Sequence, residues 1–175
     1  MAPVTSLDAR PPVGAAVLER RAARALLVDD RERVLLFVGI DPALPERGRW
    51  WFTPGGGLND DEDDAAGLVR EVREETGLVV DPDQVGPPVW RREAEFLFAD
   101  QWYRQSERFF LLRIGSHTVD TSGFEPLEAS AVQGHRWWHL DDLAVTDEVV
   151  YPATLVAELR RLLADGAPEQ PYEVA

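Results

Sequence analysis

The chain has 175 residues, enough for one domain with a proper core, and a formal net charge of -14. A chain this acidic binds nucleic acid poorly, and we therefore expect no nucleic-acid partner. Its carboxylates can still bind phosphorylated ligands through divalent cations. The absence of cysteine excludes disulfides and thiolate metal sites. No apolar run approaches the ~18 residues of a membrane span, and the start does not resemble a signal peptide, so we expect a cytoplasmic protein without a membrane partner.

The first part of the chain predicts an extended arm followed by a hairpin. Residues 1–16 contain prolines and small residues without a clear period. Apolar runs at 22–28 and 34–40 flank the polar stretch 29–33, which is a hairpin pattern. Residues 41–49 are rich in turn formers and predict a loop.

A short strand, a glycine-rich turn and a helix are expected in immediate succession. The strand covers 50–53 and runs into Pro54-Gly55-Gly56-Gly57. The helix pattern extends over 62–76, and its acidic start suits the positive end of the helix dipole. The residues expected to cap its two ends are Asp60 or Asp61 and Gly77.

The second half of the chain predicts strands, one long loop and a final helix. Two long strands are expected at 89–99 and 103–114, and a further strand at 134–140. A polar loop covers 115–131, and loops of this length in compact domains are often functional. The apolar pattern of 152–164 predicts an amphipathic helix with Pro152 in its first turn.

This order of elements suggests an α/β fold with a mixed β-sheet covered by helices on its faces. We expect one domain over 17–165, preceded by the arm at 1–16 and followed by a mobile tail over 166–175.

The helix at 62–76 carries its carboxylates on one flank. At about 100° per residue, Leu68 and Thr76 fall close to Val72 and form the stripe that packs on the sheet. Three glutamates share an arc about 100° wide beside that stripe, and an arginine four positions before one of them can pair with it. These residues are Glu71, Glu74, Glu75 and Arg70.

Three carboxylates on one flank repel each other, which Mg²⁺ or Mn²⁺ would relieve because these hard ions take carboxylate oxygens. The alternative is a solvated acidic face. The preceding glycines favour the metal site, because they let the backbone approach a ligand closely.

The segment Gly56 to Leu78 resembles the Nudix box, G-x5-E-x7-R-E-U-x-E-E-x-G-U, where U is a bulky aliphatic residue. Gly56 is followed after five residues by Glu62, and seven more lead to Arg70-Glu71-Val72-Arg73-Glu74-Glu75-Thr76-Gly77-Leu78. Every fixed position is filled. Arg136-Trp137-Trp138 before Asp141-Asp142-Leu143 is also similar to the late strand and helix start common in the family.

The resemblance to this MutT-like family implies an α/β/α sandwich in which the box forms a loop-helix-loop. It further implies a hydrolase that uses Mg²⁺ or Mn²⁺ to cut a pyrophosphate bond in a small nucleotide substrate. Dimerisation is common in the family, so a homodimer is a further expectation.

Roles follow from the same resemblance. Glu74 and Glu75 would be metal ligands, and Glu71 a further ligand or the group that orients a metal-bound water. Arg70 would fix a box glutamate, Glu62 would hold the loop to the helix, and the Gly55 carbonyl would reach a metal. The residues expected to bind substrate are Gly56, Gly57 and Phe52.

Residues outside the box offer several alternatives. The polar loop supplies Glu125 or Glu128 as an additional ligand or general base, with Glu93 and Glu95 on a strand as alternatives. Among the remaining polar and aromatic candidates, the histidines are expected to be structural, most tryptophans to pack in the core, and one aromatic to stack on a nucleobase. They are His117, His135, His139, Trp50, Trp51, Trp102 and Tyr103.

The substrate within the family stays open. Enzymes for ADP-ribose often carry a Pro downstream of the box, where this chain has Arg92-Glu93-Ala94-Glu95, and those for diadenosine polyphosphates a Tyr, near which this chain has Phe96. We therefore expect a nucleoside diphosphate linked to another moiety, or a nucleoside triphosphate. The alternative function is a non-catalytic Nudix-like module that senses a nucleotide. An isoprenoid diphosphate isomerase is remote, because those enzymes depend on a catalytic cysteine.

Overall fold

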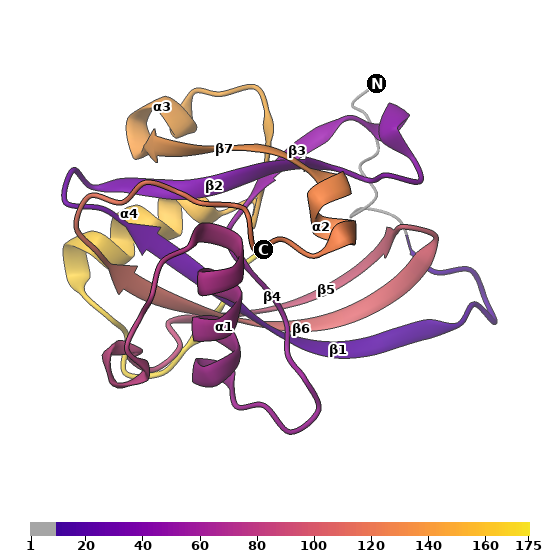
Figure 1. Cartoon of the computed structure of the whole chain (residues 1–175), viewed down its shortest axis with the longest axis horizontal. Helices are drawn as coiled ribbons and strands as arrows, with labels where there is room; N and C mark the ends of the chain where they lie inside the picture. Colours follow the sequence, from indigo (N-terminus) through magenta and orange to yellow (C-terminus); the bar gives the residue numbers. More distant parts are fainter. Residues whose placement is uncertain (1–9) are drawn as a thin grey trace.

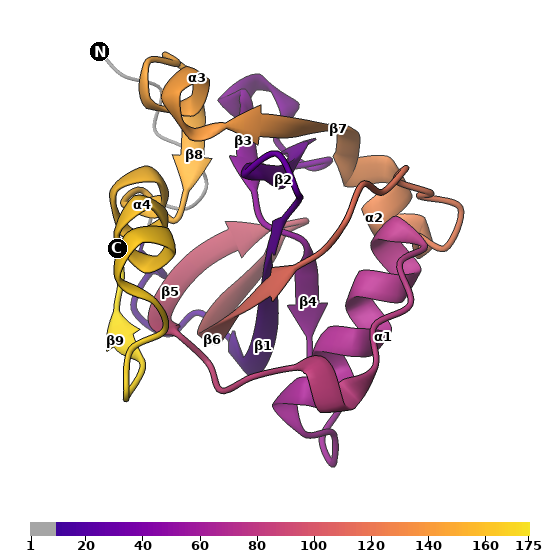
Figure 2. The same ribbon diagram turned by 90° about the vertical axis from the view of Figure 1, so that its left-hand side faces the viewer.

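The computed structural model describes residues 10–175 of the chain. A mixed β-sheet lies between helices, with α1 (Asp64–Thr76) on one face and α4 (Leu155–Asp165) on the other (Figures 1 and 2). The expected α/β/α sandwich is therefore confirmed. Of the arm expected at 1–16, residues 1–9 lie outside the described residues, and 10–16 form no helix or strand before β1 begins.

The strands of the described chain form a single sheet. Its main path runs β8-β3-β2-β1-β6-β5-β9, while β4 pairs with β1 and β7 pairs with β2. The pairing of β1 with β6 is parallel along the whole of β1, which makes the sheet mixed. The bounds are β1 Val17–Val28, β2 Arg33–Ile40, β3 Arg49–Phe52, β4 Gly55–Gly57, β5 Trp90–Phe98, β6 Gln101–Arg113, β7 Val132–His139, β8 Val149–Tyr151 and β9 Tyr172–Glu173.

The predicted hairpin between β1 and β2 is present, but the two strands pair over fewer residues than expected. The registered pair of the two strands is Val28 with Val34. The Asp29 carboxylate closes the turn, because it accepts the backbone N–H groups of Arg31 and Arg33 at 3.0 and 2.9 Å. β1 begins earlier than the apolar run predicted. Away from the turn it pairs with β4, and it pairs with β6 along its whole length.

Two hydrophobic clusters lie on opposite faces of the sheet. Leu68 and Val72 of α1 pack with small and aliphatic side chains of β1, including Ala23 and Leu27. Leu159 of α4 packs in the other cluster with aromatic and aliphatic side chains of the sheet. The predicted apolar stripe of α1 is thus buried against the sheet, which leaves its neighbouring flank for polar side chains.

The C-terminal tail, residues 166–175, contacts the sheet and α4. Its β9 pairs in parallel with β5, and Val174 is buried. The Tyr172 hydroxyl accepts a 3.0 Å hydrogen bond from Trp90 Nε1 and donates a 2.8 Å bond to Glu158. Tyr172 thus joins the two-residue strand β9 to β5 and to the first turn of α4.

Three further differences concern helices. The polar loop expected at 115–131 ends in a helical turn, α2 (Pro126–Ala131). The last helix begins at Leu155, so Pro152 precedes it and does not lie in its first turn. The remaining short helices are α3 (Leu140–Ala144), η2 (Pro45–Arg47) and η3 (Pro82–Gln84). Within residues 10–175, no helix combines the length and apolar character that crossing a membrane requires.

Candidate active site

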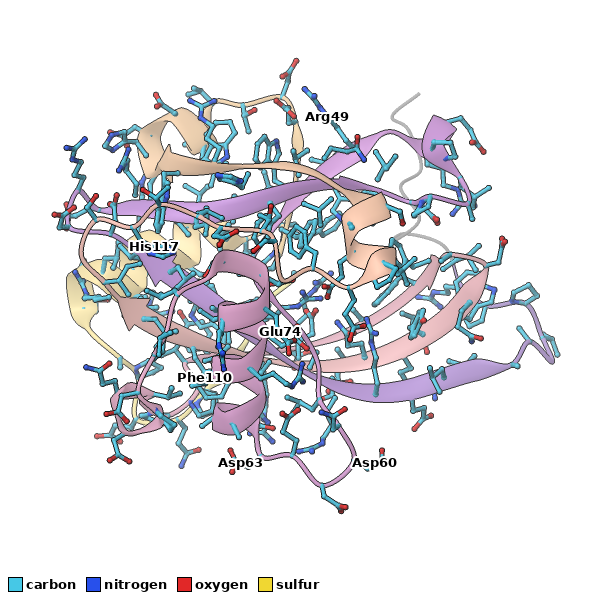
Figure 3. All side chains as sticks on the ribbon, in the orientation of Figure 1. Arg49, Asp60, Asp63, Glu74, Phe110 and His117 are labelled. Carbon is cyan, nitrogen blue, oxygen red and sulfur yellow. The ribbon has the colours of Figure 1, made fainter. Side chains whose placement is uncertain are left out.

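The box helix α1 is capped at both ends. Its N-cap is Asp63, whose carboxylate accepts the Ala66 N–H at 2.8 Å, and not Asp60 or Asp61 as predicted. Figure 3 shows Asp60 in the loop before the helix and Asp63 at its start. Gly77 ends the helix as predicted, with a left-handed backbone (φ 71°) and an N–H that donates to the Arg73 carbonyl.

The glycines before α1, expected in a turn, pair with β1 as strand β4. A Cβ on Gly55, where φ is 115°, would lie 2.2 Å from the Ala23 carbonyl oxygen. A Cβ on Gly56 would lie 2.6 Å from Oε2 of Glu71. Glycine is therefore required here because the backbone of β4 touches both the sheet and a box carboxylate.

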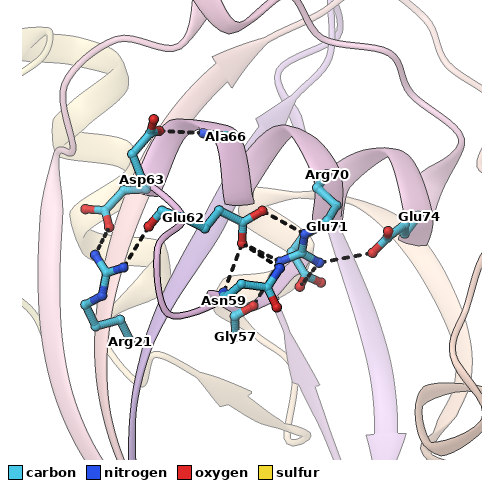
Figure 4. Close-up of polar contacts among 10 residues, drawn as sticks. Arg21, Gly57, Asn59, Glu62, Asp63, Ala66, Arg70, Glu71 and Glu74 are labelled. Atoms are coloured by element: carbon cyan, nitrogen blue, oxygen red, sulfur yellow. Dashed lines mark hydrogen bonds and ion pairs between the residues drawn. The ribbon is translucent and has the colours of Figure 1, made fainter.

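Arg70 ties the box together (Figure 4). Its guanidinium donates to both oxygens of Glu62 at 2.9 and 2.8 Å, to Glu71 at 2.7 Å, to Glu74 at 3.1 Å and to the Gly57 carbonyl at 3.1 Å. Hydrogen bonding to Arg70 lowers the pKa of Glu62 to about 2, and the same bonds raise the pKa of Arg70. The loop, the helix and two box glutamates are thus held by one cation.

Three carboxylates converge beside this network. One oxygen from each of Glu71, Glu75 and Glu128 lies within 4.8 Å of the others. Glu71 and Glu75 are buried, and burial raises the pKa of all three groups, most strongly at Glu75. Carboxylate oxygens at such short separation fit a hard divalent cation. Glu74 is more exposed and pairs with Arg70 at the edge of the site.

The loop that delivers Glu128 is fastened to the end of α1. The Asp120 N–H donates to the Thr76 carbonyl at 2.9 Å, and His117 Nε2 lies 2.8 Å from the same oxygen. A Cβ on Gly123 would lie 2.4 Å from the Glu74 carbonyl oxygen, so the loop passes in close contact with the helix. These contacts explain how a residue about fifty positions after the box reaches it.

Of the two loop glutamates, the structure brings Glu128 into the carboxylate cluster. The Glu125 N–H donates to Oε2 of Glu128 at 2.9 Å, so Glu125 is the N-cap of α2 and orients the Glu128 carboxylate. The strand alternatives lie elsewhere: Glu93 is exposed, and Glu95 pairs with Arg104. Among the described residues, neither belongs to a metal-ligand group.

The hollow that holds the carboxylates adjoins a second, largely aromatic pocket. Phe52, Phe98 and Ala131 border both. The aromatic pocket is further lined by Trp50, Phe96, Phe109 and Tyr151. Tyr103 lies at the carboxylate side and stacks on Phe96, with ring centroids 5.5 Å apart. Trp51 packs in the core against Trp138.

The floor of the aromatic pocket is polar, which the sequence patterns did not reveal. Glu107, 3% exposed, accepts from Arg24 at 3.1 Å, Arg92 at 3.0 Å and Gln105 at 2.6 Å. Burial opposes ionisation of Glu107, but the charges of Arg24 and Arg92 lower its pKa overall. Arg24 also donates to the Gly55 carbonyl. The strand pattern could have indicated these polar residues, because Gln105 and Glu107 alternate in phase with Phe109 on β6 and so face the same side.

The histidines take no part in the carboxylate cluster. His117 contacts the end of α1, and His135 lies edge-on to Phe37. His139 is exposed and precedes α3. No histidine belongs to a group able to hold a metal in the described part of the chain.

Comparison with known proteins decides the family. A family model described as a NUDIX domain matches residues 18–163, most of the chain. The chain belongs to the Nudix family. It is a Nudix hydrolase with a complete box, and the family supports hydrolysis of a pyrophosphate bond and general use of divalent metal ions.

Curated relatives are distant from this Nudix hydrolase. An RNA pyrophosphohydrolase of Dinoroseobacter shibae is 24% identical over 152 residues, covering 78% of this chain and 85% of that protein. Nudix hydrolase 25 of Arabidopsis thaliana is 31% identical over 74 residues, covering 37% and 42%. The name of the Arabidopsis protein states no substrate, so the substrate of this chain is argued from its own pockets.

Solved structures match the Nudix fold over most of the chain. A Caenorhabditis elegans Ap4A hydrolase complex superposes with a TM-score of 0.56 at 17% identity, covering 83% of this chain and 98% of that one. An ADP-ribose pyrophosphatase of Streptococcus suis gives 0.54 at 18% identity, covering 88% and 97%. At these identities the likeness establishes the fold alone.

Proposed function

We propose that this Nudix hydrolase uses Mg²⁺ or Mn²⁺ to hydrolyse a pyrophosphate bond in a nucleoside diphosphate linked to another moiety, or in a nucleoside triphosphate. The observation that carries the proposal is the convergence of Glu71, Glu75 and Glu128 within 4.8 Å in a hollow of the surface. Burial makes this arrangement unfavourable for three ionised carboxylates. A divalent cation would relieve it, so the donor set fits the metals that the family uses.

The residues of the chain prepare the site in four ways. The Gly55 N–H holds Glu75 at 2.6 Å, and Arg70 holds Glu71. The Glu125 N–H holds Glu128, which serves as an additional ligand or as the base that takes the proton of the attacking water. Gly56 leaves the space that the Glu71 carboxylate occupies. The bound metal would neutralise phosphate oxygens and lower the pKa of the water.

Glu74 has a supporting place in this proposal. Its carboxylate is the most exposed of the box glutamates and pairs with Arg70 at 3.1 Å. From this position it can reach a metal at the outer edge of the hollow or keep Arg70 oriented. Both roles make it part of the catalytic set that we propose, together with Arg70, Glu71 and Glu75.

The organic part of the substrate is assigned to the aromatic pocket. Phe52 borders both hollows, so a ring stacked there would leave its phosphates directed toward the carboxylates. Gly56 and Gly57 expose backbone at the same rim. A planar nucleobase suits such walls better than an aliphatic chain, which supports a nucleotide substrate.

A panel of nucleoside triphosphates and nucleoside diphosphate derivatives, incubated with Mg²⁺ and with Mn²⁺, tests the proposal. Mass spectrometry of the products would identify both the substrate and the bond cut. We expect turnover that EDTA abolishes. Tight nucleotide binding without any product, after long incubation with both metals, would instead favour a sensing module.

A further inference from the structure

Arg20, on β1, stands where the two hollows meet. It lines both the aromatic pocket and the hollow that contains the carboxylates. A Cβ built on Gly57 would lie 3.6 Å from Nη1 of Arg20, and the neighbouring Gly56 is in contact with Glu71. A substrate with its organic group in the aromatic pocket must pass Arg20 before its phosphates reach the carboxylates.

The other cations that line these hollows are each paired with a carboxylate. Arg24 and Arg92 share Glu107, and Arg70 pairs with Glu62 and its neighbours. Within residues 10–175, Arg20 forms no ion pair. Its Nε donates to Oε1 of the neutral Gln105, and its guanidinium lies 4.4 Å from the ring centre of Tyr103.

This environment disfavours the charge of Arg20. Burial and the nearby charge of Arg24 lower its pKa, and the weaker attractions of Tyr103, Glu107 and Glu71 do not offset them. Because Arg20 has no carboxylate partner among the described residues, an anion that enters the hollow can pair with it without breaking an existing ion pair. A guanidinium group can donate two hydrogen bonds to the oxygens of one phosphate. A substrate phosphate that contacts no metal would need donors of this kind.

We propose that Arg20 is a specificity-determining residue that binds the phosphate nearer the organic group, while the carboxylates and their metal hold the next one. The inference rests on the proposed function, since it assumes a substrate with at least two linked phosphates. On this proposal, the spacing between Arg20 and the carboxylate cluster is the feature that selects a diphosphate over a monophosphate.

Binding of inorganic pyrophosphate with Mg²⁺, measured by calorimetry, tests this role without turnover. Arg20→Met keeps the length of the side chain and removes its charge, and Arg20→Gln keeps a donor for Gln105. Arg104→Gln is the matched control, because Arg104 lies on the neighbouring strand and pairs with the exposed Glu19 outside both hollows. We expect about tenfold weaker binding for the two Arg20 variants and a change below about twofold for the control.

Kinetics on the best substrate of the panel give a second readout. If Arg20 contacts the phosphate equally in the bound and transition states, losing that contact in the Arg20 variants raises KM about tenfold and leaves kcat nearly unchanged. A wild type that turns over no substrate, yet binds pyrophosphate through Arg20, would refute the proposed function and keep this inference. Equal pyrophosphate affinity of the wild type and a folded Arg20 variant would overturn it. Undetectable binding by the wild type, or failure of both variants to fold, would also overturn it.

Discussion

The backbone N–H of Gly55 donates a 2.6 Å hydrogen bond to Oε2 of the buried Glu75, joining β4 to the box helix. The carbonyl of the same glycine accepts from Arg24, which is in turn held by Glu107. Gly55 thus connects a carboxylate of the proposed metal site with the polar floor of the aromatic pocket. The orientation of Glu75 is fixed by the fold before any ligand binds.

Glu75→Gln should abolish activity without unfolding the chain. The amide can still accept the Gly55 N–H but is a poor ligand, so we expect more than about a hundredfold loss of kcat. Thermal unfolding in EDTA should show equal or greater stability than wild type at neutral pH, because a buried ionised carboxylate is removed. Glu93→Gln, on an exposed strand position, is the control. Wild-type activity in Glu75→Gln would contradict the assigned role.

The stabilising effect of Mg²⁺ should grow with pH. Burial raises the pKa of Glu71, Glu75 and Glu128 above the ordinary value of 4.5, so the folded metal-free chain binds protons more tightly than the unfolded chain. This contribution to stability is complete below about pH 4.5 and is lost as the pH rises through the folded pKa values. Mg²⁺ competes with these protons.

The measurement is the melting temperature with Mg²⁺ minus that with EDTA, between about pH 5 and pH 8. We expect the difference to increase steadily with pH in the wild type and to be much smaller in Glu75→Gln. A Mg²⁺ effect of constant size across this range would show that these carboxylates do not bind the ion.

Glu62→Gln should weaken the fold through Arg70. The low pKa of Glu62, about 2, means that its ionised form stabilises the folded chain above about pH 4.5 and that this stability is lost as the pH falls toward 2. We expect a loss of about 1–3 kcal/mol in urea unfolding at pH 7. The gap between variant and wild type should close in acid, and a gap independent of pH would argue against the pair as its source.

Gly56→Ala should disturb the site while sparing the fold. The added Cβ would lie 2.6 Å from Oε2 of Glu71, and the far end of a side chain can move where a backbone could not. We expect more than about tenfold loss of kcat, because Glu71 leaves its position beside Glu75 and Arg70. Gly86→Ala has open space around the new methyl group and should behave as wild type in the same assay.

Paired variants can distinguish the roles of Glu128 and Glu125. Only the Glu128 carboxylate reaches Glu71 and Glu75, whereas Glu125 orients it through a backbone N–H that Glu125→Gln retains. We predict at least about tenfold loss of kcat for Glu128→Gln and a clearly smaller loss for Glu125→Gln. The reverse ranking would move the role to Glu125.

The sequence could predict the box and the helix that carries it, because the spacing of Glu71, Glu75 and Val72 depends only on helical geometry. Local patterns also placed most strands and the stop at Gly77. They misplaced the N-cap, since several consecutive acids offer the same cap and only the entry of the chain into α1 selects Asp63.

What the sequence could not predict depends on contacts between distant segments. The choice of Glu128 over Glu125 follows from a loop fastened to Thr76 and from a helical turn that no local period reveals. The docking of the tail depends on Tyr172 meeting Trp90, far apart in the chain. The polar floor beneath the aromatic pocket depends on β1 lying parallel to β6, a pairing that adjacent strand patterns do not suggest.

The most direct measurement of the central claim is anomalous diffraction from crystals of the wild-type protein soaked with Mn²⁺. The peak should lie among the carboxylates of Glu71, Glu75 and Glu128, within coordination distance of at least two of them, and should disappear in Glu75→Gln crystals. Manganese bound elsewhere, with these side chains turned away from it, would contradict the claim that this cluster is the metal site.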